Sequence, residues 1–192
     1  MGELLIMRHG KSDWDGGVAD HDRRLASRGV RAARTVGRFL AAAEAAPDLV
    51  IASSAERARA TAEELLGDGG FACPLRVEPA LYGATAEGVL DVVRGVEAPV
   101  GRLLVVGHEP WCSELVALLA GGGAVAFPTA AVACLDAGDR PWAALEPGGA
   151  VLRWLLPPRL LPCPGLVTTT TRRHQGATAS RQRFASPAPS WC

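Results

Sequence analysis

The chain has 192 residues, of which 48% are apolar, which is enough for one globular domain with its own core. Its 20 Lys and Arg residues balance 20 Asp and Glu residues, which argues against a nucleic-acid-binding protein that works through a strong positive field. The five cysteines are scattered and form no CxxC pair, so we expect reduced thiols and no bound metal.

The N-terminal region gives no sign of a targeting or membrane segment. Glu3 and Arg8 bracket only four apolar residues, which are too few for the core of a signal peptide. No apolar stretch approaches the ~20 residues that a membrane-spanning helix requires. From this composition we expect a soluble cytoplasmic protein, without a membrane or nucleic-acid partner.

Short apolar strands alternate with helical patterns along most of the chain. In chain order, the periodicity predicts a strand over 4–7, a helix over 28–46, a strand over 49–52, a helix over 55–66 and a short strand over 75–77. It then predicts a helix over 85–96 with Thr85 as its N-cap, a strand over 103–106, and a helix over 110–120 with Pro110 in its first position. Two closing strands are expected over 130–135 and 150–155.

This alternation predicts the fold class and the domain boundary. Apolar strands separated by helices are typical of an α/β domain with three layers, in which helices cover both faces of a largely parallel sheet. After about Pro157 the composition shifts to Pro, Thr, Ser and Arg without periodicity. We therefore expect one domain over residues 1–157 and a disordered tail over 158–192.

Basic side chains follow three of the expected strands, at the point where each strand ends. Arg8 and His9 follow the first strand, "SSAERARAT" (53–61) places Arg57 just inside the helix after the second, and "GHEP" (107–110) places His108 at a helix entrance. In α/β sheets, ligands bind beyond the carboxyl ends of the strands. We expect these four side chains to converge if the three strands are neighbours.

The residue types in this group point to phosphoryl transfer. Arginine forks match phosphate oxygens in bidentate geometry, and a neutral histidine nitrogen is a nucleophile that can hold a covalent intermediate. Phosphoryl transfer requires mainly positioning and charge neutralisation, which two Arg and a second His supply without a metal or another cofactor. The set predicts a phosphatase or mutase that forms a phosphohistidine.

The same residues resemble a known family. "RHG" after the first strand, Ser-x-x-x-Arg-Ala-x-x-Thr and Gly-His-x-Pro are similar to the motifs of the histidine phosphatase superfamily. Within it, "RHGKSDW" and "DRRLASRG" (22–29) resemble the SixA-type phosphohistidine phosphatases. The resemblance covers about residues 3–157 and implies a phosphoglycerate mutase-like fold.

The resemblance also implies residue roles. His9 would be the nucleophile that takes the phosphoryl group, and Arg8, Arg57 and His108 would clamp the phosphoryl oxygens. Arg23 matches the family's Arg before Pro-Leu and is a candidate for substrate binding.

The sequence departs from the family pattern at two positions. Arg24 replaces the proline after Arg23, and Ala60 stands where Gln is common. The first change could alter the loop that carries Arg23.

The identity of a proton donor stays open at this point. Superfamily members that cleave phosphate esters resemble one another in having a carboxylic acid, because an alkoxide is a poor leaving group. Glu78, Glu87 and Glu109 are candidates, although Glu109 also suits a helix start. A phosphohistidine leaves as imidazole and needs less acid assistance. Together with the short chain, which has no long insertion to roof the site, this favours a protein-borne phosphohistidine as substrate.

Two other functions remain possible from the sequence. One is a small-molecule phosphomonoesterase on the same site, and the other is a phospho-binding module that has lost turnover. Arg59 is expected on a solvated, mixed-charge helix face. Trp14 is equally suited to anchor a loop or to line the pocket.

Overall fold

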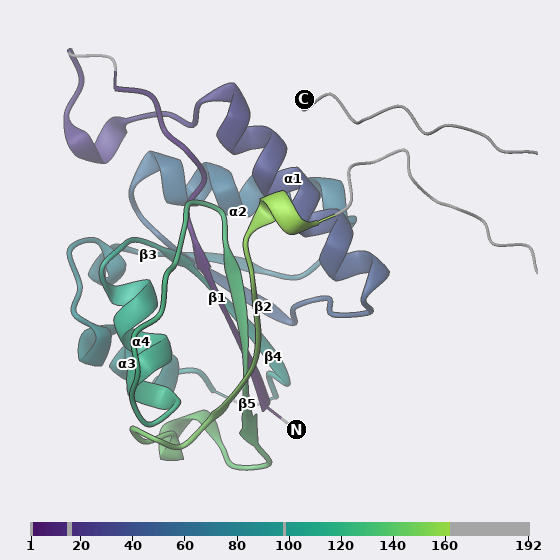
Figure 1. Ribbon diagram of the computed structural model, residues 1–192, viewed down its shortest axis with the longest axis vertical. Helices are drawn as coiled ribbons and strands as arrows, with labels where there is room; N and C mark the ends of the chain where they lie inside the picture. Colours follow the sequence, from purple (N-terminus) through teal and green to yellow (C-terminus); the bar gives the residue numbers. More distant parts are fainter. Residues whose placement is uncertain (1, 15–16, 98, 162–192) are drawn as a thin grey trace, which may run out of the picture.

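The computed structural model describes residues 2–14, 17–97 and 99–161 and contains a six-stranded sheet with strand order β3-β2-β4-β1-β5-β6 (Figure 1). β1, β2, β3 and β4 are mutually parallel, whereas β5 is antiparallel to both β1 and β6, so that β5 alone runs against the others. The prediction of an α/β fold with a largely parallel sheet is confirmed. The strands are β1 (Gly2–Arg8), β2 (Leu49–Ser53), β3 (Leu75–Glu78), β4 (Arg102–Gly107), β5 (Val132–Gly138) and β6 (Val151–Leu156).

Helices cover both faces of this sheet because alternate strand residues point to opposite sides (Figure 1). Leu5 and Met7 of β1 pack under one helix pair, and Leu4 and Ile6 pack under the other. The first pair is α1 (Ser27–Ala42) and α2 (Glu56–Gly69), and the second is α3 (Ala86–Arg94) and α4 (Trp111–Leu119). Within the described residues, no helix has the length and apolar character needed to cross a membrane.

The predicted elements are all present, and their ends differ by a few residues. α1 ends at Ala42 rather than at residue 46, because Glu44 adopts a left-handed conformation (φ 53°) and the Ala45 N–H closes back onto Leu40 O (2.8 Å). Thr85 caps α3 as expected, accepting from Gly88 N at 3.2 Å.

The prediction that Pro110 is the first helical residue of α4 is wrong. Pro110 is the N-cap instead, since its carbonyl accepts a hydrogen bond from Glu114 N at 3.1 Å and the helix itself begins at Trp111. The peptide bond between Glu109 and Pro110 is cis.

The described chain continues for four residues past the boundary expected at residue 157. Residues 158–160 form a 3-10 turn, and Leu161 is buried in the core cluster under α1 and α2. Composition could not identify this contact, because a single apolar side chain anchors a Pro-rich segment. The remainder of the expected tail, residues 162–192, lies outside the described residues.

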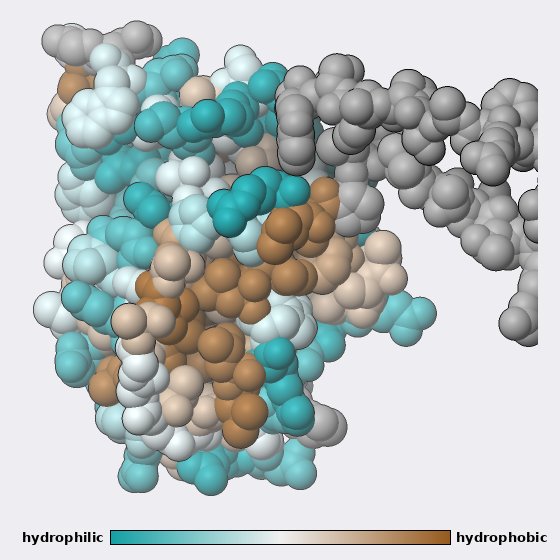
Figure 2. All heavy atoms as spheres, viewed as in Figure 1, coloured by the Kyte–Doolittle hydropathy of each residue, from teal (hydrophilic) through white to brown (hydrophobic). Residues whose placement is uncertain are grey.

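One edge of the sheet carries a strip of partly exposed apolar side chains. β6 is the edge strand, so its side chains have a neighbouring strand on one side only. Leu152 and Leu155 pack against the core, while Val151 is 60% exposed. Figure 2 shows apolar atoms gathered on the face of the molecule that carries β6, with hydrophilic atoms around them.

Candidate active site

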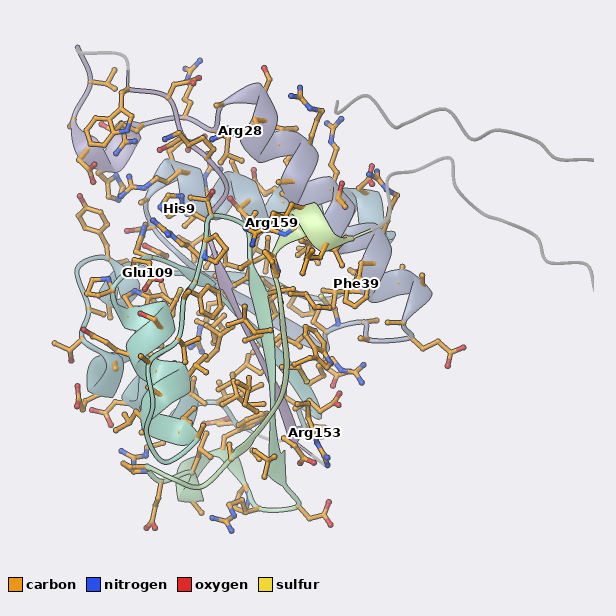
Figure 3. All side chains as sticks on the ribbon, viewed as in Figure 1. His9, Arg28, Phe39, Glu109, Arg153 and Arg159 are labelled. Atoms are coloured by element: carbon orange, nitrogen blue, oxygen red, sulfur yellow. The ribbon has the colours of Figure 1, made fainter. Side chains whose placement is uncertain are left out.

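Four side chains from three strand ends meet at the carboxyl edge of the sheet. Arg8 ends β1 and lies opposite Gly107 of β4, which His108 follows directly. Arg57 lies in the first turn of α2, the helix after β2. The ring centroids of His9 and His108 are 5.1 Å apart, and Arg57 Nε lies 3.3 Å from His9 Nε2. The structure thus brings the four predicted residues together, and Figure 3 shows His9 at this end of the sheet.

Two hydrogen bonds assign the proton of His9 to one ring nitrogen. His9 Nδ1 lies 2.7 Å from Gly10 O, and a carbonyl oxygen can only accept, so Nδ1 carries the proton. Arg57 Nε–H can only donate, so Nε2, 3.3 Å away, carries the lone pair. His9 is therefore held as a neutral imidazole with its unprotonated Nε2 facing a guanidinium.

The surroundings of His9 keep it neutral. Its pKa is lowered from 6.5 to about 4, mainly by burial and then by the positive charges of Arg57, Arg8 and Arg23, while the hydrogen bond to Gly10 opposes the shift. At pH 7 the ring keeps the lone pair that a nucleophile requires.

His108 is buried beside His9 and is also neutral. Its pKa is lowered to about 3, first by burial, next by repulsion from His9 at the low pH where that ring is protonated, and then by the charge of Arg57. His108 Nε2 lies 2.8 Å from Ser53 Oγ at the end of β2. Ser53 Oγ also accepts a long hydrogen bond from Ala55 N (3.5 Å). A hydrogen bond donated by Ser53 to Nε2 would place the ring proton of His108 on Nδ1.

Two buried nitrogen atoms in this group have no hydrogen-bond partner within the described part of the chain: Arg8 Nε and His108 Nδ1. Arg8 is otherwise fixed by a hydrogen bond from Nη1 to Phe127 O (2.8 Å). Buried polar groups without partners are rare in folded proteins and call for an explanation. An anion bound at His9 would provide acceptors for both.

Close backbone packing fixes the loop that carries His9. A Cβ on Gly10 would lie 2.9 Å from Gly29 O, and a Cβ on Gly29 would lie 2.2 Å from Lys11 O, so only glycines fit at this crossing. Gly10 N donates to Thr61 Oγ1 (3.0 Å), and Thr61 Oγ1 donates to Arg57 O (2.6 Å). The buried Thr61 hydroxyl therefore ties the His9 loop to the helix that carries Arg57.

Arg23 is held in the loop between β1 and α1. Its Nη2 donates to Ser12 Oγ (2.5 Å), its Nε to Asp13 O (3.0 Å) and its Nη1 to Asp20 Oδ1 (2.8 Å). The guanidinium carbon lies 3.6 Å from the ring centroid of Trp14, which is 76% exposed. Trp14 thus covers Arg23 from the solvent side.

Arg24 leaves this loop intact. Its side chain is exposed, and its carbonyl accepts from Asp13 N at 3.0 Å. Arg23 keeps its hydrogen bonds to Ser12, Asp13 and Asp20 with Arg24 in place of the family proline.

Comparison with known proteins identifies the family. The model of the histidine phosphatase superfamily (branch 1) matches residues 4–86, which include Arg8, His9 and Arg57. An uncharacterized protein from Mycobacterium tuberculosis is 43% identical over 156 residues, covering 76% of this chain and 96% of the relative. The chain belongs to the histidine phosphatase superfamily.

Solved structures agree with this assignment. A structure described as a candidate phosphohistidine phosphatase, SixA, from Nakamurella multipartitia has a TM-score of 0.71 and 31% identity, covering 82% of this chain and 96% of its own. The protein histidine phosphatase SixA in complex with tungstate has a TM-score of 0.67 and 26% identity, covering 82% and 97%. The chain is therefore a phosphatase, that is, a hydrolase that acts on a phosphorylated substrate.

In this histidine phosphatase, sequence reasoning missed a carboxylate at the site. Asp20 Oδ2 accepts from Arg57 Nη2 (2.9 Å) and from the Tyr82 hydroxyl (3.0 Å), and Oδ1 accepts from Arg23. Asp20 lies in a 3-10 turn, residues Asp20–Asp22, that gives no hydrophobic pattern. Its spacing three residues before Arg23 was the available signal.

The three glutamates considered as proton donors have other surroundings. Glu78 Oε1 accepts from Ala80 N (3.2 Å), and Glu109 Oε2 accepts from Ser113 N (3.2 Å) and Oγ (2.8 Å), so both carboxylates cap turns. Glu87 is exposed in the first turn of α3. Arg59 pairs with glutamates on the surface of α2, as expected.

A hollow of about 530 Å³ adjoins the phosphatase site and is lined by Arg8, Glu109, Phe127, Leu155 and Arg159, among others. Figure 3 shows Glu109 and Arg159 near the same end of the sheet as His9. Across residues 2–14, 17–97 and 99–161, no group of three or more His, Cys, Asp or Glu residues could hold a metal ion.

Proposed function

We propose that this phosphatase hydrolyses phosphohistidine carried by a protein, through a phosphohistidine intermediate on its own His9 and without a metal. The observation that carries the proposal is the protonation state of His9. Its Nε2 lone pair is fixed by the hydrogen bond from Nδ1 to Gly10, and it faces the guanidinium of Arg57.

The site supplies the parts that two successive phosphoryl transfers require. In the first step, His9 Nε2 attacks phosphorus in line, the new P–N bond forms, and the bond to the substrate imidazole breaks with its electron pair leaving on that imidazole. In the second step, water attacks the phosphorus on His9, the P–N bond breaks with its electron pair returning to His9 Nε2, and the protons of the water leave with inorganic phosphate. Arg8, Arg57 and His108 surround the oxygens whose charge must be neutralised in both steps.

The carboxylates at the site favour a substrate whose leaving group needs little acid assistance. The pKa of Asp20 is lowered to about 2, with the hydrogen bond from Arg23 as the largest cause, so Asp20 holds no proton to donate at neutral pH. Glu78 and Glu109 are engaged with backbone N–H groups. Imidazole is a better leaving group than an alkoxide, and this difference supports phosphohistidine over a phosphate ester.

The relatives and the surface support a protein substrate. One SixA relative is described as a candidate phosphohistidine phosphatase, and the other as a protein histidine phosphatase in complex with tungstate, an oxyanion that resembles phosphate in shape and charge. Within residues 2–14, 17–97 and 99–161, the hollow beside Arg8 and Arg159 leaves the edge of the site open. A phosphohistidine on the surface of another protein requires such access.

The experiment that tests this function compares phosphate release from two substrates by the wild type and by His9→Ala. The substrates are a phosphohistidine-bearing protein domain and an aryl phosphate at equal concentration. We expect faster release from the phosphohistidine, lost in His9→Ala. Preference for the ester would instead indicate a small-molecule phosphomonoesterase. No release that depends on His9, from either substrate, would contradict the proposed reaction.

A further inference from the structure

The guanidinium of Arg57 is already engaged by an anion that belongs to the chain itself. Arg57 Nη2 donates to Asp20 Oδ2 (2.9 Å), and Nη1 donates to the backbone carbonyl of Asp20 (2.5 Å). Arg57 Nε, on the same edge of the guanidinium as Nη2, faces His9 Nε2 at 3.3 Å. A phosphoryl group on His9 brings its oxygens to this edge, because the two nitrogens form the fork that binds phosphate side-on.

Two further hydrogen bonds hold the Asp20 carboxylate beside Arg57. Its Oδ1 accepts from Arg23 Nη1 (2.8 Å), and its Oδ2 also accepts from the Tyr82 hydroxyl (3.0 Å). Its side chain is 51% exposed, so a ligand that enters from solvent can meet its charge. These same contacts keep the carboxylate ionised, as its pKa of about 2 indicates.

We propose that Asp20 is a specificity-determining residue, whose fixed negative charge competes with phosphate oxygens for Arg57 and selects against phosphorylated groups that carry further negative charge. A neutral or cationic leaving group, such as imidazole or imidazolium, meets no such repulsion. The inference rests on the proposed function, because it assumes that phosphoryl groups bind between His9 and Arg57. It deepens that function by stating which leaving groups the site accepts.

The size of the effect follows from the distance between the charges. One guanidinium separates Asp20 Oδ2 from His9 Nε2. The carboxylate of Asp20 and a phosphate at His9 would therefore both contact the same guanidinium. Two negative charges that close together, near the protein surface, repel strongly enough to change the affinity for phosphate on the order of tenfold. Selection through a repulsive group of this kind is a common source of specificity.

The test uses Asp20→Asn, which keeps the size of the side chain and removes its charge. Asp22→Asn is the matched control, because Asp22 lies in the same 3-10 turn, is 69% exposed and contacts His21 instead of an arginine. Calorimetry measures the Kd of inorganic phosphate for the wild type and both variants. Calorimetry also measures the Kd values of phenylphosphonate and 4-carboxyphenylphosphonate. These two ligands differ by one remote negative charge, and their binding requires no turnover.

We expect Asp20→Asn to bind phosphate about tenfold more tightly than the wild type. We also expect the ratio of the Kd of 4-carboxyphenylphosphonate to the Kd of phenylphosphonate to fall several-fold in this variant. Asp22→Asn should change neither quantity. Asp20→Ala, which removes the charge together with its contacts, should shift both quantities in the same direction as Asp20→Asn.

Each contrary result has a distinct meaning. Unchanged or weaker phosphate binding in Asp20→Asn, with a lower kcat, would overturn the inference and make Asp20 a positioning residue for Arg57. Absence of phosphate binding in every variant would overturn both the inference and the phosphate site. A third outcome is that Asp20→Asn binds phosphate more tightly while the wild type does not hydrolyse phosphohistidine. This outcome would support the inference and reject the proposed substrate.

Discussion

The hydroxyl of Thr61 accepts a hydrogen bond from the backbone N–H of Gly10 at 3.0 Å, which connects the loop that carries His9 to the middle of α2. Thr61 is fully buried and donates its own proton to Arg57 O at 2.6 Å. One side chain therefore helps to set the position of His9 relative to Arg57, through hydrogen bonds to the backbone of Gly10 and Arg57.

Removing this hydroxyl should reduce both stability and activity. Thr61→Val keeps the shape of the side chain and leaves the Gly10 N–H buried without a partner, at a cost of about 1–3 kcal/mol in the free energy of unfolding. We expect kcat on phosphohistidine to fall on the order of tenfold, because His9 is no longer held in its position relative to Arg57. Denaturant unfolding and steady-state kinetics measure the two effects.

The matched control for Thr61 is Thr35→Val on α1. Thr35 also donates to the carbonyl four residues earlier (Arg31 O, 3.0 Å), but its environment is exposed. This variant should keep the wild-type kcat and change the unfolding free energy by less than about 0.5 kcal/mol. Equal losses in the two variants would show that Thr61 has no special role.

Arg57 and Arg59 lie two residues apart on α2 and should differ sharply in importance. Arg57 faces His9 and is buried, whereas Arg59 pairs with Glu56 (2.6 Å) and Glu63 (3.1 Å) on the surface. Arg57→Ala should lower kcat on the order of 10²–10³-fold, because a preorganised donor at the transferring phosphoryl group is removed. Arg59→Ala should stay near the wild type. Comparable rates for both variants would disprove the assignment of Arg57.

The protonation of His9 should occur well below the usual range of histidine. With its pKa lowered to about 4, mainly by burial, His9 stays neutral as the pH falls from 7 to 5 and gains a proton only near pH 4. NMR titration of His9, assigned by comparison with His9→Gln, measures this directly. The acid limb of the rate profile should fall in the same region, since the protonated ring has no lone pair for attack. A midpoint near 6.5 would contradict the role of burial.

Glu109 should act as a helix cap and not as the proton donor. Its carboxylate accepts from Ser113 N and Oγ at the start of α4. Glu109→Ala should lower the free energy of unfolding by about 1 kcal/mol and leave the rate on phosphohistidine within about threefold of the wild type. A loss on the order of 100-fold on an aryl phosphate, without a change in stability, would identify Glu109 as an acid.

The sequence predicted those features that depend on local periodicity and chain order. The continuous apolar run in β1, which is buried on both faces, and the 3.6-residue stripes of the helices define the three layers, and strand ends in a parallel sheet share one edge. Arg8, His9, Arg57 and His108 were therefore identifiable, because each stands at a strand-to-helix junction. Their convergence follows from the central positions of β1, β2 and β4.

The features that escaped prediction depend on contacts between distant segments. Asp20 meets Arg57 and Tyr82 from a loop without periodicity, and Thr61 meets Gly10 across 51 residues. Leu161 is buried by a contact that Pro-rich composition conceals. The hydrophobic pattern of a single segment does not predict which distant residue such a side chain contacts.

The most direct test of the central claim is to trap the covalent intermediate. The protein is mixed with a phosphohistidine-bearing domain, quenched in base within milliseconds to seconds, and digested for mass spectrometry. We predict a phosphoryl group, stable in base and labile in acid, on the peptide that contains His9, and none in His9→Ala. Turnover by His9→Ala at near wild-type rates, or a phosphoryl group on another residue of the wild type, would contradict the account.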